Sequence, residues 1–584
     1  MELRTCLVLL SVTAVLADDE WRLVKTAQGP VRGRKHPTED IYTFFNIPYA
    51  TAPVGVEKFK APLSPPIWSE PFDAVDKQVK CPQPTITIMD YSAFTTTKED
   101  CLIANVYVPN TTNKNLTVVV YIHGGGFVMG FGEMFKATQF MKTKDIIIVT
   151  FNYRLSIHGF LCLGTEDVPG NAGMKDQVAA LRWVQKNIAS FGGNPDDVTI
   201  AGYSTGSASA DLLMLSKSAE GLFHRVISGS DGGLAAFTVQ RDPIEVAKIF
   251  ARKNNFTNVD DIYALEEFYK TASWELLTSD PFINRTDSTF LFSPCVERDT
   301  GDGAFITESP LSKFKKSNYK KLPVMYGFAN MTGQVRVNFF DVWKHKMNEK
   351  FSDFLPANLK FESEEEREVI AKKVKDFYFG DKPVDDDNIL GYVDYFSDVM
   401  FTYPTLWATK LHVEAGNNQI YLYEYSFVDE NVPFVPHTNI RGANHCAQTI
   451  AVLDGTGNVT KPDKSLATPE FQKMQKILRE IWHNFIKTGK PVPEGSPLPA
   501  WPPAGANRSP HMVLDKKLEL RGVLLEERTR FWDGIYQKYY RDAVPPPTPA
   551  PRTRSASSRN FWSASFFVVV FTWHFFIFQF LSEI

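Results

Sequence analysis

The sequence predicts an α/β fold in which a mainly parallel central sheet is covered by helices on both faces. Short, continuous apolar runs recur along the chain, and such runs are typical of strands buried on both faces. Stretches with apolar residues at helical spacing lie between these runs. Strands that alternate with helices favour a parallel sheet, because the helices connect neighbouring strands and cover the sheet.

Five runs carry the strand prediction. Each is a short, mostly apolar segment, and the first of them ends at a row of glycines. In chain order the predicted strands are 118–122, 146–150, 198–201, 322–326 and 420–425.

Three helices are predicted between and after these strands. Residues 175–188 place apolar side chains three or four positions apart, which gives one buried face. Residues 207–215 follow the third strand run and are also mostly apolar. A third helix is expected to begin at Pro469, with Thr468 as its N-cap, and to end at Gly489.

Composition excludes some classes of function. The chain has 584 residues, of which 43% are hydrophobic and 22% charged, and these values allow a large core. The net charge is −4 and no basic run is present, so we expect no nucleic-acid partner.

The N-terminus predicts a secretory signal peptide over residues 1–17. An apolar run from Cys6 to Val15 precedes the small residue Ala17, and the run is too short to span a membrane core of ~30 Å. Cleavage leaves five cysteines, an odd number that requires at least one free thiol or an intermolecular bond. The globular domain is expected over residues 18–540.

Seven N-x-Ser/Thr tripeptides are consistent with passage through the secretory route. Two of them, at Asn330 and Asn507, are not among the predicted glycan sites. The predicted sites are Asn110, Asn115, Asn255, Asn284 and Asn458.

The C-terminus predicts a membrane tether. Residues 541–560 form a Pro/Ser-rich spacer, and residues 561–581 are hydrophobic, uncharged and long enough to span a bilayer. A membrane helix would leave the arginines of the spacer outside, against the positive-inside tendency. Small residues at 555–557 suit attachment of a glycosylphosphatidylinositol anchor, which is the favoured alternative. Either way we expect the protein at the outer face of the plasma membrane.

A G-x-S-x-G sequence at 202–206 places Ser204 between a predicted strand and a predicted helix. This is the context of a nucleophile elbow, in which a sharp turn needs glycine on both sides of the serine. The serine then projects above the sheet at the positive end of the helix. The pattern therefore predicts Ser204 as a catalytic nucleophile.

A second motif, H-G-G-G at 123–126, follows the first predicted strand. Such a loop is typical of lipases and esterases, where its bare backbone N–H groups form one half of an oxyanion hole. We expect the amides of Gly125, Gly126 and Thr205 to stabilise the charge that develops on a carbonyl oxygen.

These motifs, with several others, resemble the carboxylesterase/cholinesterase (type B) family over nearly the whole mature chain, with an insect-type carboxylesterase as the expected match. The further motifs that carry the resemblance lie at 45–50, 99–102, 152–155, 170–177 and 191–195. The resemblance implies an α/β-hydrolase fold, hydrolysis of a small-molecule carboxylic ester through an acyl-enzyme, and no metal or other cofactor. It also implies a disulfide between Cys81 and Cys101, and His445 as the catalytic base. Cys162, Cys295 and Cys446 receive no partners, and each is interpreted as a buried thiol.

The sequence departs from the family at the acid of the catalytic triad. The family places glutamate in a G-x-x-x-x-E-G segment, and here Thr332 occupies that position. Threonine can hold the imidazole by a hydrogen bond but offers no negative charge, and neutralising the acid in serine proteases costs about four powers of ten in rate. Glu308 and Asp341 are the acidic residues nearby in sequence, and His437 is the alternative histidine.

Two functions follow from this reading. The first is a carboxylic ester hydrolase of reduced activity, with uncharged esters as the expected substrates. The second is a catalytically impaired surface protein that binds a partner of unknown identity, as some relatives do. The intact serine, histidine and oxyanion loop favour the enzyme, whereas Thr332 and the membrane tether favour the binding protein.

Overall fold

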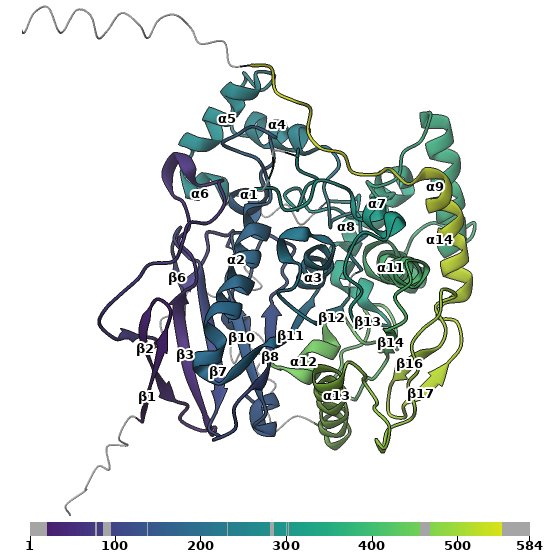
Figure 1. Ribbon diagram of the computed structural model, residues 1–584. Helices are drawn as coiled ribbons and strands as arrows, with labels where there is room; N and C mark the ends of the chain where they lie inside the picture. Colours follow the sequence, from purple (N-terminus) through teal and green to yellow (C-terminus); the bar gives the residue numbers. More distant parts are fainter. Residues whose placement is uncertain are drawn as a thin grey trace, which may run out of the picture.

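A 13-stranded sheet runs through the centre of the protein in the order β1-β2-β3-β7-β10-β8-β11-β12-β13-β14-β16-β17, with β4 beside β2. The computed structural model describes residues 20–551 apart from 76–78, 86–94, 137, 231, 281–284, 300, 302 and 456–467. All neighbours from β10 to β16 pair in parallel, and antiparallel strands extend the sheet at both ends. The α/β-hydrolase fold expected from the sequence is therefore present (Figure 1).

The strands of the large sheet are β1 (Trp21–Thr26), β2 (Gly29–Lys35), β3 (Ile41–Pro48), β4 (Phe72–Asp73), β7 (Ile103–Pro109), β8 (Leu116–Ile122), β10 (Ile146–Phe151), β11 (Gly193–Tyr203), β12 (Arg225–Gly229), β13 (Val324–Ala329), β14 (Ile420–Tyr425), β16 (His511–Leu514) and β17 (Glu519–Arg521). Two small sheets pair β5 (Val79–Lys80) with β6 (Thr96–Thr97), and β9 (Phe135–Lys136) with β15 (Asp454–Gly455).

The α-helices are α1 (Ser156–Phe160), α2 (Ala172–Asn187), α3 (Thr205–Leu215), α4 (Pro243–Lys253), α5 (Ile262–Thr271), α6 (Trp274–Leu277), α7 (Pro310–Lys316), α8 (Phe340–Glu349), α9 (Glu364–Phe379), α10 (Ile389–Ser397), α11 (Tyr403–Glu414), α12 (Ala447–Val452), α13 (Pro469–Thr488) and α14 (Glu526–Tyr539). As predicted, Pro469 opens α13, and the Thr468 hydroxyl accepts a hydrogen bond from the third residue of the helix.

Two separate cores cover the two faces of the sheet, as the continuous apolar runs require. Strand β8 supplies Val118 and Val120 to the core that contains the apolar residues of α2 and α3. The alternate residues Val119 and Tyr121 belong to the core that contains the buried face of α13. Because side chains alternate across a strand, a strand between two helical layers must be apolar at every position.

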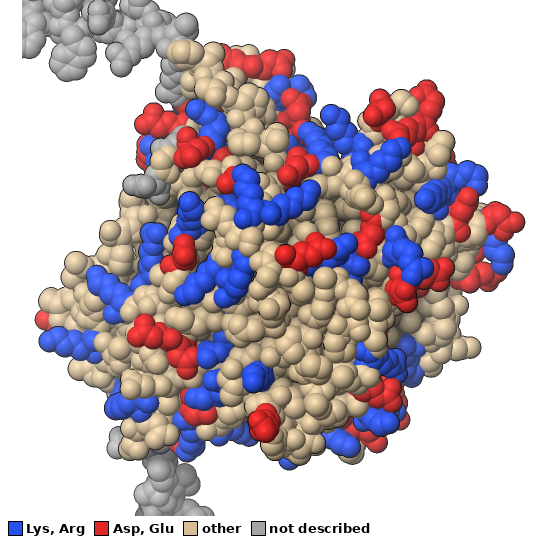
Figure 2. Space-filling view, turned by 45° about the vertical axis from the view of Figure 1, so that its right-hand side comes forward, with Lys and Arg blue, Asp and Glu red and all other residues tan. Residues whose placement is uncertain are grey.

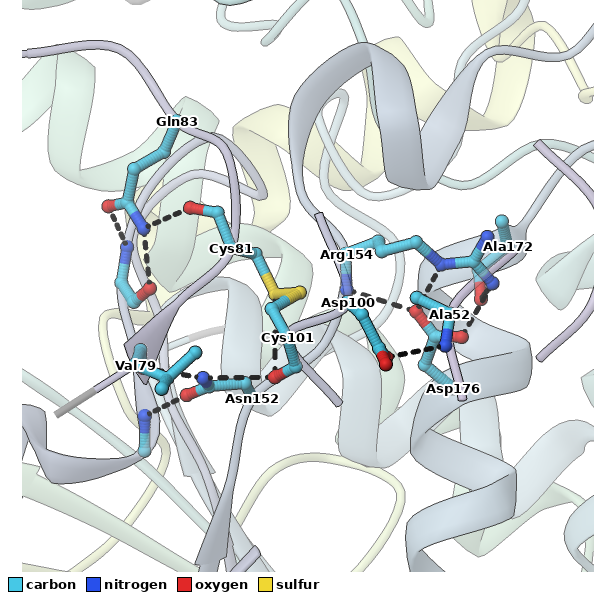
Figure 3. The surroundings of a disulfide bond; sticks show 12 residues. Ala52, Val79, Cys81, Gln83, Asp100, Cys101, Asn152, Arg154, Ala172 and Asp176 are labelled. Carbon is cyan, nitrogen blue, oxygen red and sulfur yellow. Dashed lines mark hydrogen bonds and ion pairs between the residues drawn. A yellow bond between two sulfur atoms is a disulfide. The ribbon is translucent and has the colours of Figure 1, made fainter. Parts of the chain in front are cut away.

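Two disulfides stabilise loops beside the sheet. One joins Cys81 and Cys101, the pair implied by the family resemblance, and lies next to Asn152, whose amide donates to Cys101 O (Figure 3). The other joins Cys162 and Cys295, so the interpretation of these two residues as unpaired thiols was wrong. Gly170 makes room for this bond, because a Cβ there would lie 2.7 Å from Cys295 Sγ and 2.8 Å from Cys162 Sγ.

The remaining cysteine of the globular part, Cys446, is buried and free. Its burial raises the pKa of its thiol, which opposes reactivity.

After α14 the chain continues as an extended segment, which we call the C-terminal strap (residues 541–551). It runs from α14 to α5 (Figure 1). Its Arg541 forms an ion pair with Asp242 at 2.5 Å, its Pro546 is buried, and Tyr263 on α5 donates to a strap carbonyl at 2.7 Å. The described part of the expected spacer therefore lies against the globular body.

The expected signal peptide (1–17), the rest of the spacer (552–560) and the hydrophobic segment (561–581) lie outside the described residues. Within the described part of the chain, no helix is both long and apolar enough to span a bilayer. Basic and acidic side chains are interspersed over the face shown in Figure 2.

Candidate active site

Ser204 occupies a sharp turn between β11 and α3. Its backbone has φ 52° and ψ −129°, outside the regions that non-glycine residues favour, and its N–H donates to Gly229 O at 2.8 Å. A Cβ at Gly202 would lie 2.3 Å from Gly206 O, and one at Gly206 would lie 2.3 Å from Ile122 O. Both flanking positions therefore require glycine, which is the geometry of a nucleophile elbow.

The glycine loop after β8 lies directly against this elbow. Gly125 and Gly126 have φ values of 115° and 69°, and a Cβ on Gly125 would lie 2.1 Å from Met129 O. The backbone N–H of Phe127 donates to Thr205 Oγ1 at 3.2 Å, which ties the loop to the first residue of α3. The two halves of the expected oxyanion hole are thus brought together by the ends of neighbouring parallel strands.

His445 lies in the loop between β14 and α12 and contacts Thr332, as the family resemblance implies. The distance between Thr332 Oγ1 and His445 Nδ1 is 2.8 Å. The imidazole stacks on Phe401, with ring centroids 4.2 Å apart. The loop is held in place by Asn330, whose Oδ1 accepts a hydrogen bond from Ala443 N at 3.0 Å.

Ser204 Oγ and His445 are not joined by a hydrogen bond in the described part of the chain. Catalytic hydrogen bonds are often long in unliganded sites and tighten when substrate binds. The structure therefore shows the hydrogen bond between Thr332 and His445 but none between His445 and Ser204.

The electrostatic environment of His445 disfavours the charged imidazole. Burial and, to a lesser degree, the positive charge of Arg336 together lower its pKa from 6.5 to about 3. Thr332 is fully buried and neutral, so it does not oppose this shift. The imidazole is consequently neutral at physiological pH, which is the form that acts as a base.

The acidic residues considered as alternatives lie elsewhere. Glu308 Oε2 interacts with Lys316 at 2.5 Å and with Ser312 at 3.0 Å. Asp341 pairs with Lys344 at 3.3 Å and is strongly exposed. His437, the alternative base, belongs with Asp341 to an exposed cluster of side chains around Asp386.

The structure also places the predicted glycan sites. Asn110, Asn115 and Asn255 are exposed, whereas Asn284 and Asn458 lie outside the described residues. Asn330, which was not among the predicted sites, is half-buried, and its side chain holds the histidine loop.

Sequence reasoning missed three side chains beside the candidate site. Phe401 comes from the π-helical turn Asp398–Thr402, and Phe290 from the loop before Cys295. Arg336 lies in the short helix η7 (Thr332–Phe339), four residues after the acid position. No local motif in the sequence pointed to any of the three.

Comparison with known proteins identifies the scaffold. The sequence pattern described as the carboxylesterase family matches residues 20–532. The chain belongs to the carboxylesterase family. Among relatives of this carboxylesterase-family chain, juvenile hormone esterase of Heliothis virescens is 30% identical over 498 residues, which are 81% of this chain and 86% of that protein. Pyrethroid hydrolase Ces2a of Mus musculus is 29% identical and covers 87% of this chain and 90% of its own length.

Solved structures agree with this assignment. Juvenile hormone esterase from Manduca sexta, determined with OTFP covalently attached, is 28% identical and has a TM-score of 0.79. The match covers 89% of this chain and all of that one. A thermophilic pNB esterase is 25% identical, with a TM-score of 0.69 over 87% of this chain and 99% of that one. Family membership and these esterase structures support hydrolysis of carboxylic esters by this chain.

Proposed function

We propose that this carboxylesterase-family protein is a serine hydrolase that cleaves small-molecule carboxylic esters through an acyl-enzyme. The nucleophile is Ser204, the base is His445, and Thr332 orients the imidazole. The observation that carries the proposal is the strained conformation of Ser204, because an elbow of this kind is energetically costly and is typical of nucleophiles.

In the first half of the reaction, Ser204 Oγ attacks the ester carbonyl carbon while His445 Nε2 takes its proton. The amides of Gly125, Gly126 and Thr205 stabilise the oxyanion. The carbon–oxygen bond to the alcohol then breaks, and the imidazolium donates its proton to the leaving oxygen.

In the second half, water attacks the acyl-enzyme with His445 again acting as the base. The bond between the acyl carbon and Ser204 Oγ breaks, the serine regains its proton, and the carboxylic acid leaves. Each step uses only side chains and amides of this chain, so the proposal includes no cofactor.

A fluorophosphonate probe tests this proposal, because it phosphonylates only an activated serine. The wild-type protein should be labelled and should hydrolyse p-nitrophenyl butyrate, whereas Ser204→Ala should do neither. Ser218→Ala, which changes a serine after the end of α3, should behave like the wild type. Equal labelling of wild type and Ser204→Ala would contradict the assignment of the nucleophile.

The second candidate is a surface protein that uses the esterase scaffold to bind a partner. Thr332 is the observation that favours it, since the site lacks the charge that normally stabilises the imidazolium. Absence of both labelling and turnover in folded wild-type protein would favour this function over the first.

We also propose that the protein faces the outside of the cell and is tethered there by its C-terminus. The signal peptide pattern, the two disulfides and the exposed sequons at Asn110, Asn115 and Asn255 support export. Release from cells by phosphatidylinositol-specific phospholipase C would establish a lipid anchor, and retention would favour a membrane helix.

A further inference from the structure

A buried hydrogen bond joins the helix that follows the histidine loop to the strand end beside the nucleophile. Gln448 Nε2, on α12, donates to Ser230 Oγ at 2.9 Å, and Ser230 is the first residue after β12. The two residues lie 218 positions apart in the sequence and are 2% and 0% exposed. Neither of them belongs to a motif that predicted the candidate site.

The end of β12 holds the backbone of the nucleophile. Gly229 O accepts a hydrogen bond from Ser204 N at 2.8 Å. The next residue, Ser230, donates its own N–H to Gly327 O at 2.7 Å, on β13, the strand that leads to Thr332. One short segment therefore contacts the nucleophile elbow, the strand of the acid position and, through Ser230 Oγ, the helix α12.

Gln448 is joined closely to the base. It lies three residues after His445, and a hydrogen bond from Ala447 N to Asn444 O at 3.1 Å closes the chain around the histidine. The amide of Gln448 also lies near the elbow, since a Cβ on Gly229 would be 3.6 Å from its Nε2. A shift of the Gln448 side chain relative to β12 should therefore move His445 relative to the serine.

The other contacts of the histidine loop come from the side of β13. Thr332 Oγ1 lies 2.8 Å from His445 Nδ1, and Asn330 Oδ1 accepts from Ala443 N at 3.0 Å. Both contacts are between neutral groups, which form weaker hydrogen bonds than a charged acid would. No hydrogen bond joins Ser204 Oγ to His445 among the described residues, so the approach of base and nucleophile depends on where the loop is held.

We propose that Gln448 is a positioning residue of this active site, which keeps the His445 imidazole within reach of Ser204 through its hydrogen bond to Ser230. The inference deepens the proposed hydrolase function and rests on it. Because Thr332 fixes the imidazole less strongly than a carboxylate, the position of the base depends more on the contacts of its loop and helix. A misplacement of about 1 Å in a catalytic group can cost about 100-fold in rate.

The same hydrogen bond should contribute little to stability, which allows positioning to be separated from folding. Among the described residues, Gln448 Oε1 is buried and has no hydrogen-bond partner. Methionine at this position removes the unpaired oxygen together with the donor, and its flexible side chain is of similar length. The loss of one favourable hydrogen bond is thus offset by the loss of an unfavourable buried acceptor.

Gln448→Met and Ser230→Ala test the inference in one double-mutant cycle. Each variant should lower kcat for p-nitrophenyl butyrate by about 10- to 100-fold, while KM stays within three-fold and the melting temperature within a few degrees. The double variant should be no slower than the slower single variant, because the second change removes a bond that is already lost. Unchanged kcat in both single variants, or losses that multiply in the double variant, would overturn the inference.

Gln185→Met is the matched control. Gln185, on α2, donates to Pro195 O at 2.7 Å and to Leu222 O at 3.0 Å, so the change removes a side-chain amide that holds backbone away from the reaction centre. Its kcat should stay within two-fold of the wild-type value whatever its effect on stability. A loss as large as that of Gln448→Met would show that any weakened packing slows the reaction, and would reject a specific role for Gln448.

A structural measurement keeps the inference answerable if the protein hydrolyses no ester. Absence of turnover in the folded wild type would reject the hydrolase proposal. Crystal structures of the wild type and of Gln448→Met then compare the distance between Ser204 Oγ and His445 Nε2, which should be longer in the variant by about 1 Å or more. An unchanged distance would overturn the inference whatever the turnover.

Discussion

At the scale of single residues, Thr332 stands where the family has a carboxylate. This difference bears on both the charge and the tautomer of His445. A carboxylate can only accept, so it fixes the proton on Nδ1 and leaves the Nε2 lone pair for Ser204. A hydroxyl can donate or accept, so its hydrogen bond to His445 Nδ1 permits either tautomer. In one of them Nε2 carries the proton and cannot act as a base.

Restoring the acid should increase activity. Thr332→Glu should raise kcat by about ten-fold or more, since neutralising the acid in serine proteases costs about four powers of ten. Thr332→Gln has the same size without the charge and is the matched control. A higher kcat for both variants, or for neither, would show that Thr332 does not limit the reaction.

The pH dependence of the wild type should be unusual. A base acts in its neutral form, and the pKa of His445 is lowered from 6.5 to about 3. The value of kcat/KM should therefore stay level from pH 8 down to about pH 5, where an ordinary serine hydrolase has already lost activity. In Thr332→Glu the carboxylate raises the pKa of the imidazole, so the acid limb should move to higher pH. Stopped-flow mixing from a neutral stock measures both profiles before any acid unfolding, and a wild-type midpoint near pH 6.5 would contradict the burial argument.

At the scale of elements, the elbow depends on backbone atoms that approach more closely than any side chain allows. The end of β8 lies against the first turn of α3, and Gly206 is the contact point between them. The same approach brings the oxyanion loop to the serine. A change at this contact should therefore affect catalysis through the position of an entire helix.

Gly206→Ala should abolish activity, because its Cβ would lie 2.3 Å from the backbone oxygen of Ile122. A destabilisation of a few kcal/mol is expected from overpacking of this kind. Gly534→Ala in α14 is the control, since nothing lies within 4 Å of that Cβ position, and it should stabilise the helix by about 0.5–1 kcal/mol. Chemical denaturation and ester turnover measure the two effects, and an active Gly206→Ala variant would refute the close contact.

At the scale of the whole molecule, the core contains several neutral histidines. His123, His158 and His412 are at most 3% exposed. Burial lowers the pKa of His123 to about 4, and burial lowers those of His158 and His412 to about 3. The unfolded chain binds protons at these residues near pH 6.5, whereas the folded chain does not.

The protein should therefore lose stability between pH 6.5 and about pH 4. Below 6.5 the unfolded state binds more protons, and each buried neutral histidine then costs about 1.4 kcal/mol of unfolding free energy per pH unit. Urea titrations at pH 7, 6 and 5 measure this slope. Unchanged stability from pH 7 to pH 5 would contradict the burial of these rings in a neutral form.

Much of the fold was predictable because its central strands are apolar at most positions. All five predicted strands are present. Strand β12 was not predicted, because its five residues include arginine, serine and glycine and do not form a continuous apolar run. The positions of Ser204 and the glycine loop followed from local motifs, and those of Thr332 and His445 from family resemblance. The bond between Cys162 and Cys295 spans 133 residues, and the neighbouring rings of Phe237, Phe290 and Phe401 come from three distant segments, so no local pattern predicted either. Long-range packing alone brings them together.

The C-terminal strap determines where the protein can be shortened or joined to another. A truncation after residue 540 would remove the partner of Asp242 and uncover the surface beneath Pro546, so the product should be less soluble and less stable. A truncation after 551 leaves both in place. Any tag or fluorescent reporter added there would emerge beside α5 and not at the end of α14, and distances measured between reporters should be interpreted from that point.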